Sequence, residues 1–239
     1  MKPLKEVLWS EHTRDEFSDW AERGTVVVVP IASTEQHGHH LPVDTDCRTV
    51  EYVAAEAARS LDDVPVLVTR VIPFGVSPHH MVHNGTITLR VVTVINMLRE
   101  ICESIAAQGF ERILILSGHG GNDNTIRAAA LELKHTLNMQ IEACCWFGPV
   151  QEKIDAICEG PCHTIGHAGE AETSAILALA PESVHEEKYE LVKNISDAYS
   201  ASADKGERIL RAGAEAVAEL LRDMAARPGK KVVGIQQAK

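Results

Sequence analysis

A short segment near the N-terminus, Thr34 to Asp46, reads T-E-Q-H-G-H-H-L-P-V-D-T-D and combines carboxylates with histidines. Glu35, His37 and Asp46 are side chains of the kind that hold zinc, manganese or iron. The segment directly follows the apolar run Thr25–Ile31, which predicts a buried strand. Because ligands bind beyond the carboxyl ends of strands in open α/β sheets, this arrangement predicts a divalent-metal site and a metal-dependent enzyme.

A second motif, S-G-H-G-G-N-D-N over Ser117–Asn124, follows the apolar run Arg112–Leu116. Its glycines let the backbone come close around His119. If the two strands are parallel neighbours, four candidate ligands converge above the sheet: Glu35, His37, Asp46 and His119. Two divalent ions that share a carboxylate can activate water and polarise a carbonyl. We therefore expect up to two ions per chain, bridged by Asp46.

A third motif, G-H-A-G-E-A-E-T-S, runs from Gly166 to Ser174. Glu170 and Glu172 are two residues apart, so on a helix they point about 200° from each other. Both can serve one site only if the helix begins near Glu170. His167 could transfer a proton to a leaving nitrogen or carbon, with Glu172 near enough to orient it.

The other histidines and the cysteines allow more than one interpretation. His79, His80 and His83 either line a substrate mouth or belong to an exposed polar loop. His39 and His40 either support the ligands or are ordinary loop residues. The glycines around His119 could cradle a phosphate at a helix N-terminus, but the P-loop lysine is missing. The six cysteines form no C-x-x-C pair and indicate reduced thiols, with a reactive thiol at Cys47 as the alternative.

Strands and helices alternate along the chain. Apolar runs predict strands over residues 25–31, 64–71, 112–116 and 139–146, with a short one possible over 86–88. Helical patterns cover residues 11–22, 47–60, 91–108, the stretch from about 125 to 137, 170–179 and 208–226. Glu16 is placed to cap the first helix at Thr13. The last dozen residues predict a short strand or a loose tail. This alternation predicts a parallel, layered α/β fold, which we expect to form a single domain over residues 1–239.

Composition excludes several classes of partner. The chain has 239 residues, of which 45% are hydrophobic and 24% charged, as in ordinary globular proteins. Its formal net charge of −11 argues against nucleic acid and against an anionic membrane surface. Aromatic residues, at 4%, are too scarce for stacking platforms for single-stranded nucleic acid. No run approaches the roughly 20 apolar residues of a membrane span, and the first residues lack a signal-peptide core. We therefore expect a cytoplasmic protein.

Taken together and in order, the three motifs resemble the creatininase (creatinine amidohydrolase) family over about Thr25 to Pro181. The resemblance implies a three-layer sandwich with a mostly parallel central sheet flanked by helices. It also implies a two-metal site, hydrolysis of a cyclic or open amide, and a homo-oligomer, often a hexamer. Carried over residue by residue, the metal ligands are Glu35, His37, Asp46 and His119, and the proton-transfer residue is His167.

The chain departs from creatininase itself in two places. Creatininase has H-Y-E where this chain has His119-Gly120-Gly121, so one carboxylate ligand is missing, and we expect Glu170 to replace it. The tryptophans that cover the substrate of creatininase are absent from Gly160–Ile165. Creatinine is therefore not the favoured substrate, and the polar segment His79–Thr86 is the expected specificity loop.

Several functions stay open from the sequence. Other members of the superfamily act on formamidopyrimidines, on a peptide-derived redox cofactor and on an oxidised inositol ring. The alternatives to amide hydrolysis are a hydrolase that opens an oxidised cyclic polyol, or a metal-dependent isomerase that stabilises an enediolate. A further alternative is an inactive protein that keeps the metal and binds a small ligand.

Overall fold

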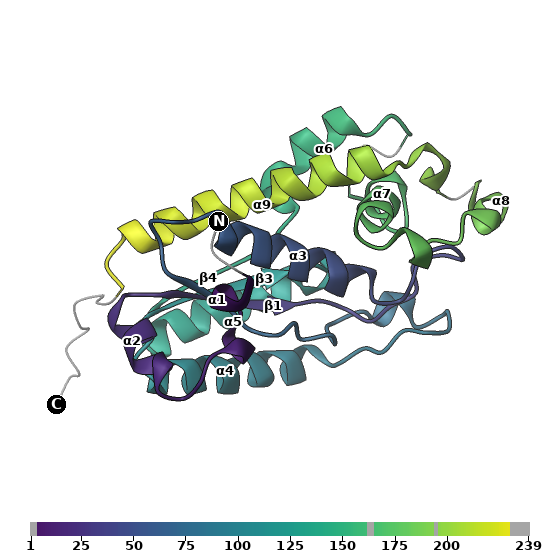
Figure 1. The fold of residues 1–239 in the computed structure, drawn as a ribbon. Helices are drawn as coiled ribbons and strands as arrows, with labels where there is room; N and C mark the ends of the chain where they lie inside the picture. The colour runs from purple at the N-terminus through teal and green to yellow at the C-terminus, as the bar shows by residue number, and fades with distance from the viewer. Residues whose placement is uncertain (1–3, 162–164, 194–195, 230–239) are drawn as a thin grey trace.

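A computed structural model describes residues 4–161, 165–193 and 196–229 of the chain. Its centre is a parallel four-stranded sheet in the order β2-β1-β3-β4 (Figure 1). The strands are β1 (Val26–Ile31), β2 (Val66–Val68), β3 (Arg112–Ser117) and β4 (Gln140–Cys145). The predicted strand or tail at the C-terminus falls mostly on residues 230–239, outside the described part of the chain.

Helices cover both faces of the sheet. In Figure 1, α3 and α9 lie above the strands, while α4 and α5 lie below them. The helices are α1 (Leu4–Val7), α2 (Glu16–Glu22), α3 (Thr45–Arg59), α4 (Val91–Ala107), α5 (Asp123–Thr136), α6 (Gln151–Ile157), α7 (Glu170–Leu179), α8 (Tyr189–Val192) and α9 (Ala203–Ala226).

The sequence of β1 explains why it sits in the middle of the sandwich. All six of its residues are buried, as expected for a parallel strand that is covered on both faces. Val26 and Val28 join the core beneath α3 and α9, whereas Val27 and Val29 join the core above α4 and α5. The alternation of side chains along the strand thus divides one apolar run between two cores. The three-layer α/β prediction is confirmed.

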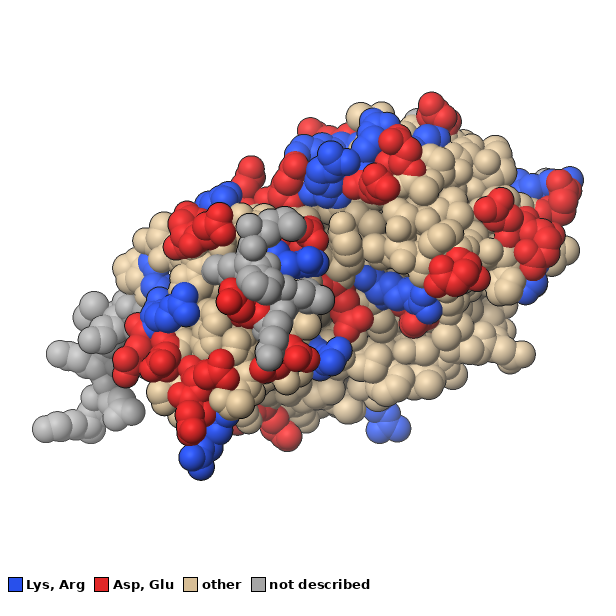
Figure 2. Space-filling view, viewed as in Figure 1, with Lys and Arg blue, Asp and Glu red and all other residues tan. Residues whose placement is uncertain are grey.

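The outer face of α9 is charged, in contrast to the face that packs on the sheet. Figure 2 shows acidic and basic side chains interspersed along the upper edge of the molecule, where α6 and α9 run in Figure 1. Several pair across this surface, such as Lys153 with Glu215 at 3.9 Å and Arg208 with Asp204 at 3.7 Å. Such exposed pairs contribute little to stability, so this face is a solvated helix surface.

Most predicted elements are present, with shifted ends. The first helix begins at Glu16 and not near Thr13, and its N-cap is Asp15 instead of the predicted Thr13. The Glu16 carboxylate still accepts a hydrogen bond from the Thr13 backbone N–H at 2.8 Å. The second predicted strand is shorter: β2 starts after Pro65 and lies at the edge of the sheet. Residues 86–88 form only one bridge, between Ile87 and Thr34. Helices α1, α6 and α8 were not predicted.

Two helix starts matter for the site. Helix α3 begins at Thr45, so Asp46 belongs to its first turn. Helix α7 begins at Glu170, which was the predicted condition for Glu170 and Glu172 to serve one site. Within the described part of the chain, no helix combines the length and apolar character needed to cross a bilayer.

Candidate metal centre

The candidate site lies at the carboxyl ends of β1 and β3, the two central strands. They are parallel neighbours, with Ile31 paired to Ser117 at their last residues. The chain passes from β1 to β2 on one side and later returns to β3 on the other. Such a junction is the switch point at which ligands bind in open α/β sheets. Glu35 and His37 follow β1, and His119 follows β3.

Helix N-termini supply the remaining carboxylates. Asp46 lies in the first turn of α3, and Glu172 lies in the first turn of α7. The N-terminus of a helix carries partial positive charge, which favours acidic side chains there. Both carboxylates therefore sit where the backbone helps to hold negative charge in a buried place.

The five side chains form two groups that share Asp46. In the first group, His119 Nδ1 lies 3.2 Å from Glu35 Oε1 and 3.3 Å from Asp46 Oδ2. In the second, His37 Nε2 lies 3.3 Å from Asp46 Oδ1 and 3.4 Å from Glu172 Oε2. Each group brings three ligand atoms close enough together to hold one metal ion. The opposite oxygens of Asp46 face the two groups, as a bridging carboxylate requires.

Backbone carbonyls orient the two imidazoles. His37 Nδ1 lies 3.1 Å from the Glu35 carbonyl oxygen, and His119 Nε2 lies 3.2 Å from the Val76 carbonyl oxygen. Donation of the outer N–H to a carbonyl leaves the inner nitrogen free as a ligand, which is the usual support of metal-binding histidines. His37 Nε2 and Asp46 Oδ2 are buried and form no hydrogen bond. These orphaned atoms fit a metal ion.

The buried negative charge of the site also favours bound cations. Glu35, Asp46 and Glu172 are only 1%, 2% and 8% exposed. Burial raises the pKa of Glu35, but His119 and the Ser77 hydroxyl outweigh it and lower that pKa to about 2. Burial lowers the pKa of His119, but Asp46 and Glu35 outweigh it and raise that pKa to about 10. Buried carboxylates at this density require positive charge among them, either as protons on imidazoles or as divalent ions.

The glycines of the second motif allow the close packing. A Cβ at Gly118 would lie 2.4 Å from the Asp46 carbonyl oxygen, and one at Gly121 would lie 2.3 Å from His119 Nε2. Any side chain at either position would displace a proposed ligand. Contact with the site thus explains Gly118 and Gly121, whereas a Cβ at Gly120 would make only an ordinary contact, with Phe147 at 3.8 Å.

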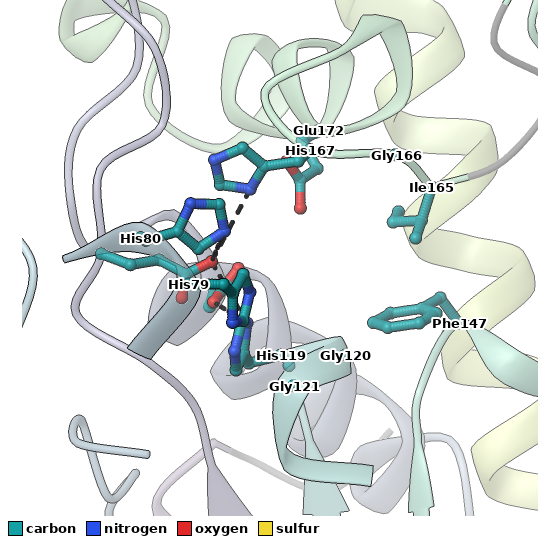
Figure 3. Close-up of a pocket in the computed structure, with 13 residues that line it drawn as sticks. His79, His80, His119, Gly120, Gly121, Phe147, Ile165, Gly166, His167 and Glu172 are labelled. Carbon is teal, nitrogen blue, oxygen red and sulfur yellow. Dashed lines mark ion pairs between the residues drawn. The ribbon is translucent and has the colours of Figure 1, made fainter. Parts of the chain in front are cut away.

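A cavity of about 170 Å³ opens above the cluster. His167, His79 and His80 line it, and Figure 3 shows these rings on one side with Phe147 and Ile165 facing them across the opening. His167 Nδ1 lies 3.6 Å from Glu35 Oε1. Burial, followed by the positive charge of nearby histidines, lowers the pKa of His167. The cavity therefore has one polar wall and one apolar wall.

The chain matches a known protein family over most of its length. The family model described as Creatininase, creatinine amidohydrolase, matches residues 10–221. The chain belongs to the creatininase family. Among curated members, it is 33% identical over 173 residues to the mycofactocin precursor peptide peptidase of Mycobacterium tuberculosis. That match covers 68% of this chain and 62% of the peptidase, so the chain spans less than two thirds of that relative.

Other members extend the comparison. The 3-dehydro-scyllo-inosose hydrolase of Thermotoga maritima is 28% identical over 188 residues, which cover 76% of this chain and 58% of that enzyme. A solved structure from Bacteroides fragilis, provisionally named creatinine amidohydrolase, has a TM-score of 0.78 at 30% identity and covers 95% of this chain and 99% of its own. A Zn-Zn form of a mutant creatininase shares the fold with a TM-score of 0.78 at 22% identity, covering 95% of this chain and all of its own. The family members named here as enzymes are hydrolases.

Glu170 is not in the position predicted for it. Its carboxylate lies 2.6 Å from Lys205 Nζ and accepts hydrogen bonds from the backbone N–H groups of Glu159 and Gly160. It belongs to none of the candidate ligand groups among the described residues. Glu172, which was predicted to orient His167, instead has its Oε2 3.4 Å from His37 Nε2 and accepts a hydrogen bond from the Ala168 backbone N–H at 2.6 Å. The prediction of Glu170 as a ligand is therefore wrong, because an ammonium and two N–H groups already satisfy it.

The remaining histidines divide clearly. His79 and His80 line the cavity, as one of the two interpretations held, whereas His83 is exposed and does not line it. His40 is buried behind the site, with its Nε2 2.9 Å from Thr173 Oγ1, and burial lowers its pKa to about 4. His39 is exposed.

Cys47 is a core residue and not a reactive thiol. Its side chain is buried, and burial together with the neighbouring Asp46 and Asp44 charges raises its pKa to about 12. Free thiols are present at Cys47, Cys102, Cys144 and Cys145, as expected. Cys162 lies outside the described residues.

Three polar residues of the site were not singled out from the sequence. Ser77 donates its hydroxyl hydrogen to Glu35 Oε2. Asn122 accepts from the Val76 N–H at 2.8 Å and donates to the Ala32 carbonyl at 3.2 Å, which ties the three loops together. Gln36 contacts both His80 and His167. Gln36 and Asn122 stand inside the first two motifs, so their position in the motifs was the available signal, whereas Ser77 had none.

Proposed function

We propose that this chain is a metal-dependent hydrolase that cleaves an amide-type C–N bond in a small polar substrate. The observation that carries the proposal is the pair of ligand groups joined by Asp46. Glu35, Asp46 and His119 would hold one divalent ion, and His37, Asp46 and Glu172 would hold the other. Zinc, manganese and iron accept this mixture of oxygen and nitrogen ligands. The Zn-Zn and Mn forms of creatininase support zinc or manganese.

When bound, divalent ions supply Lewis acidity, which polarises a carbonyl and makes water more acidic. Hydrolysis then joins the water oxygen to the carbonyl carbon, breaks the C–N bond and requires a proton on the leaving nitrogen. We assign that side of the reaction to His167, whose Nδ1 faces the cavity beside Glu35. An imidazole so placed can donate a hydrogen bond or a proton to the substrate.

His167 also lies near enough to Glu35 and His37 for these three residues to hold an ion. Its side chain is 32% exposed, however, whereas the side chains of Glu35 and His37 are 1% and 0% exposed. We therefore assign it to the substrate side of the centre. Unchanged metal content after replacement of His167 is the result that this assignment requires.

The walls of the cavity constrain the substrate. The polar wall suits an amide or a hydroxylated ring, and Phe147 with Ile165 suits an apolar or flat group opposite it. Among the described residues, no tryptophan lines the cavity, which argues against creatinine. The peptidase and the inosose hydrolase among the relatives favour a peptide-like amide first and a cyclic polyol ketone second.

The test uses the protein loaded in turn with zinc, manganese and iron. Each form is incubated with creatinine, short peptide amides, formamides and cyclic polyol ketones in ¹⁸O-labelled water. We expect one class to be cleaved, with label in the carboxyl product and loss of turnover after chelation. Conversion without incorporated label would support an isomerase. Tight metal-dependent binding without turnover of any compound would support an inactive binding protein.

We also propose that the chain forms a homo-oligomer, up to a hexamer. Large exposed apolar side chains follow the cavity-lining His80 along the chain, namely Met81, Val82 and Ile87, which are 54%, 81% and 50% exposed. Side chains of this kind are often covered by another subunit. Mass measurement of the purified protein in solution tests this, and a monomer at all concentrations would contradict it.

A further inference from the structure

The side chain of Gln36 lies between two imidazoles of the cavity wall. Its Nε2 is 2.9 Å from His80 Nδ1 and also 2.9 Å from His167 Nε2. Its Oε1 accepts a hydrogen bond from the backbone N–H of Gly38, likewise at 2.9 Å. The two rings are stacked, with centroids 4.0 Å apart and planes 24° from parallel. One amide thus joins the loop before α7 to the short 3₁₀ helix Pro78–His80.

The contact with Gly38 settles which end of the amide is which. A backbone N–H can only donate, so the atom that it contacts is the amide oxygen, and the amide nitrogen faces the rings. That nitrogen carries two hydrogens and no acceptor, so both contacted ring nitrogens must accept. A neutral imidazole carries its proton on the opposite nitrogen. These opposite nitrogens, His80 Nε2 and His167 Nδ1, lie 3.5 and 3.6 Å from Glu35 Oε1.

We propose that Gln36 is a positioning residue that sets the tautomers of His80 and His167, so that both rings present an N–H group to the cavity. His167 then meets the substrate as a hydrogen-bond donor through Nδ1, and not as a base. A donor aimed at the reacting group stabilises negative charge that develops there. Only this consequence for turnover rests on the proposed hydrolase function, because the tautomers themselves follow from the amide contacts.

The decisive experiment reads the tautomers directly. Histidine ¹⁵N NMR separates protonated from unprotonated ring nitrogens in the zinc-loaded protein. We expect the proton on Nδ1 of His167 and on Nε2 of His80. Gln36→Glu keeps the oxygen for Gly38 but replaces the donor by an acceptor, so each ring should gain a proton on the nitrogen that faces residue 36. Gln108→Glu is the matched control, since Gln108 is exposed at the far end of α4 and should change neither ring.

Kinetics and zinc content complete the test. Gln36→Met removes the hydrogen bonds at similar length, and we expect kcat to fall about 10–100-fold, with a smaller change in KM and unchanged zinc. A wild-type His167 protonated on Nε2 would overturn the proposal, as would a Gln36→Glu protein with the wild-type proton pattern. Loss of zinc from both variants would also overturn it, because Gln36 would then support the ligands. If wild type cleaves none of the test compounds, the NMR result still decides the role of Gln36 separately.

Discussion

Two carboxylates at the start of α7 stand two residues apart and belong to different regions of the molecule. Glu170 lies in a cluster with Lys205 at 2.6 Å and the backbone N–H groups of Glu159 and Gly160 at 2.9 and 2.7 Å. Glu172 accepts one backbone hydrogen bond, from Ala168 at 2.6 Å, and otherwise faces His37 and Asp46. Both side chains are buried.

The difference lies in what neutralises each carboxylate. The ammonium of Lys205 is a permanent partner, so Glu170 needs nothing from outside the chain, and the pair joins α7 to α9. Glu172 instead shares the His37 imidazole with the Asp46 carboxylate. Two carboxylates around one imidazole leave negative charge in excess. A buried carboxylate with a fixed cation is thus a structural element, whereas one that shares imidazoles with other carboxylates is a candidate ligand position.

We expect the largest effect from replacement of Asp46, which both ligand groups share. Asp46→Asn removes charge from both ligand groups, so we expect both metal ions to be lost. Turnover should then fall by more than about 10⁴-fold, the upper range for a single acid or base group. Elemental analysis and kcat on the same preparation check this. Full retention of one ion would show that Asp46 does not bridge, and a wild-type stoichiometry of one would contradict the two-metal proposal.

Replacement of His167 tests whether the loop before α7 takes part in catalysis. His167→Asn should lower kcat by about 10²–10⁴-fold while bound metal stays unchanged. A histidine that only packs against the loop would instead lower the melting temperature and leave turnover per folded molecule near normal. Measurement of kcat, metal content and melting temperature on one sample separates these outcomes.

Two isosteric variants test the different roles of Glu170 and Glu172. Glu172→Gln should lose about half of the bound metal and keep the fold, because it removes one ligand charge from one group. Glu170→Gln should keep the metal but lower the free energy of unfolding by about 3 kcal/mol, since it leaves Lys205 without its buried partner. Metal analysis and chemical denaturation of both proteins provide the measurements. A reversed result, with metal lost only from Glu170→Gln, would restore Glu170 as the ligand.

We expect the smallest effect from replacement of Cys47, the residue after Asp46. Cys47→Ala should leave kcat and metal content unchanged and cost about 1 kcal/mol of stability through lost core packing. Because the pKa of Cys47 is about 12, the native thiol should also resist alkylation near neutral pH. Mass spectrometry after treatment with iodoacetamide checks this, and rapid modification of Cys47 in the folded protein would contradict the assignment to the core.

The sequence alone determined the parallel α/β architecture and four of the proposed ligands. Apolar runs of strand length, each followed by a polar motif and a helix, place those motifs at one edge of a sheet whatever the details of packing. The convergence of Glu35, His37, Asp46 and His119 was therefore predictable, because these residues follow strands or open the helix after one. The first turn of α7 was likewise predicted at Glu170.

Only the tertiary structure decided which partners the side chains of the site have, because those partners are far apart in the sequence. Lys205 is 35 residues from Glu170 in the chain, and only the packing of α9 against α7 brings its ammonium to that carboxylate. The same holds for Gln36, whose contacts with His80 and His167 join segments 44 and 131 residues apart. Residue type and spacing limit which side chains can reach a site. Which of them a charge or a hydrogen bond already occupies depends on partners that only the folded chain brings together.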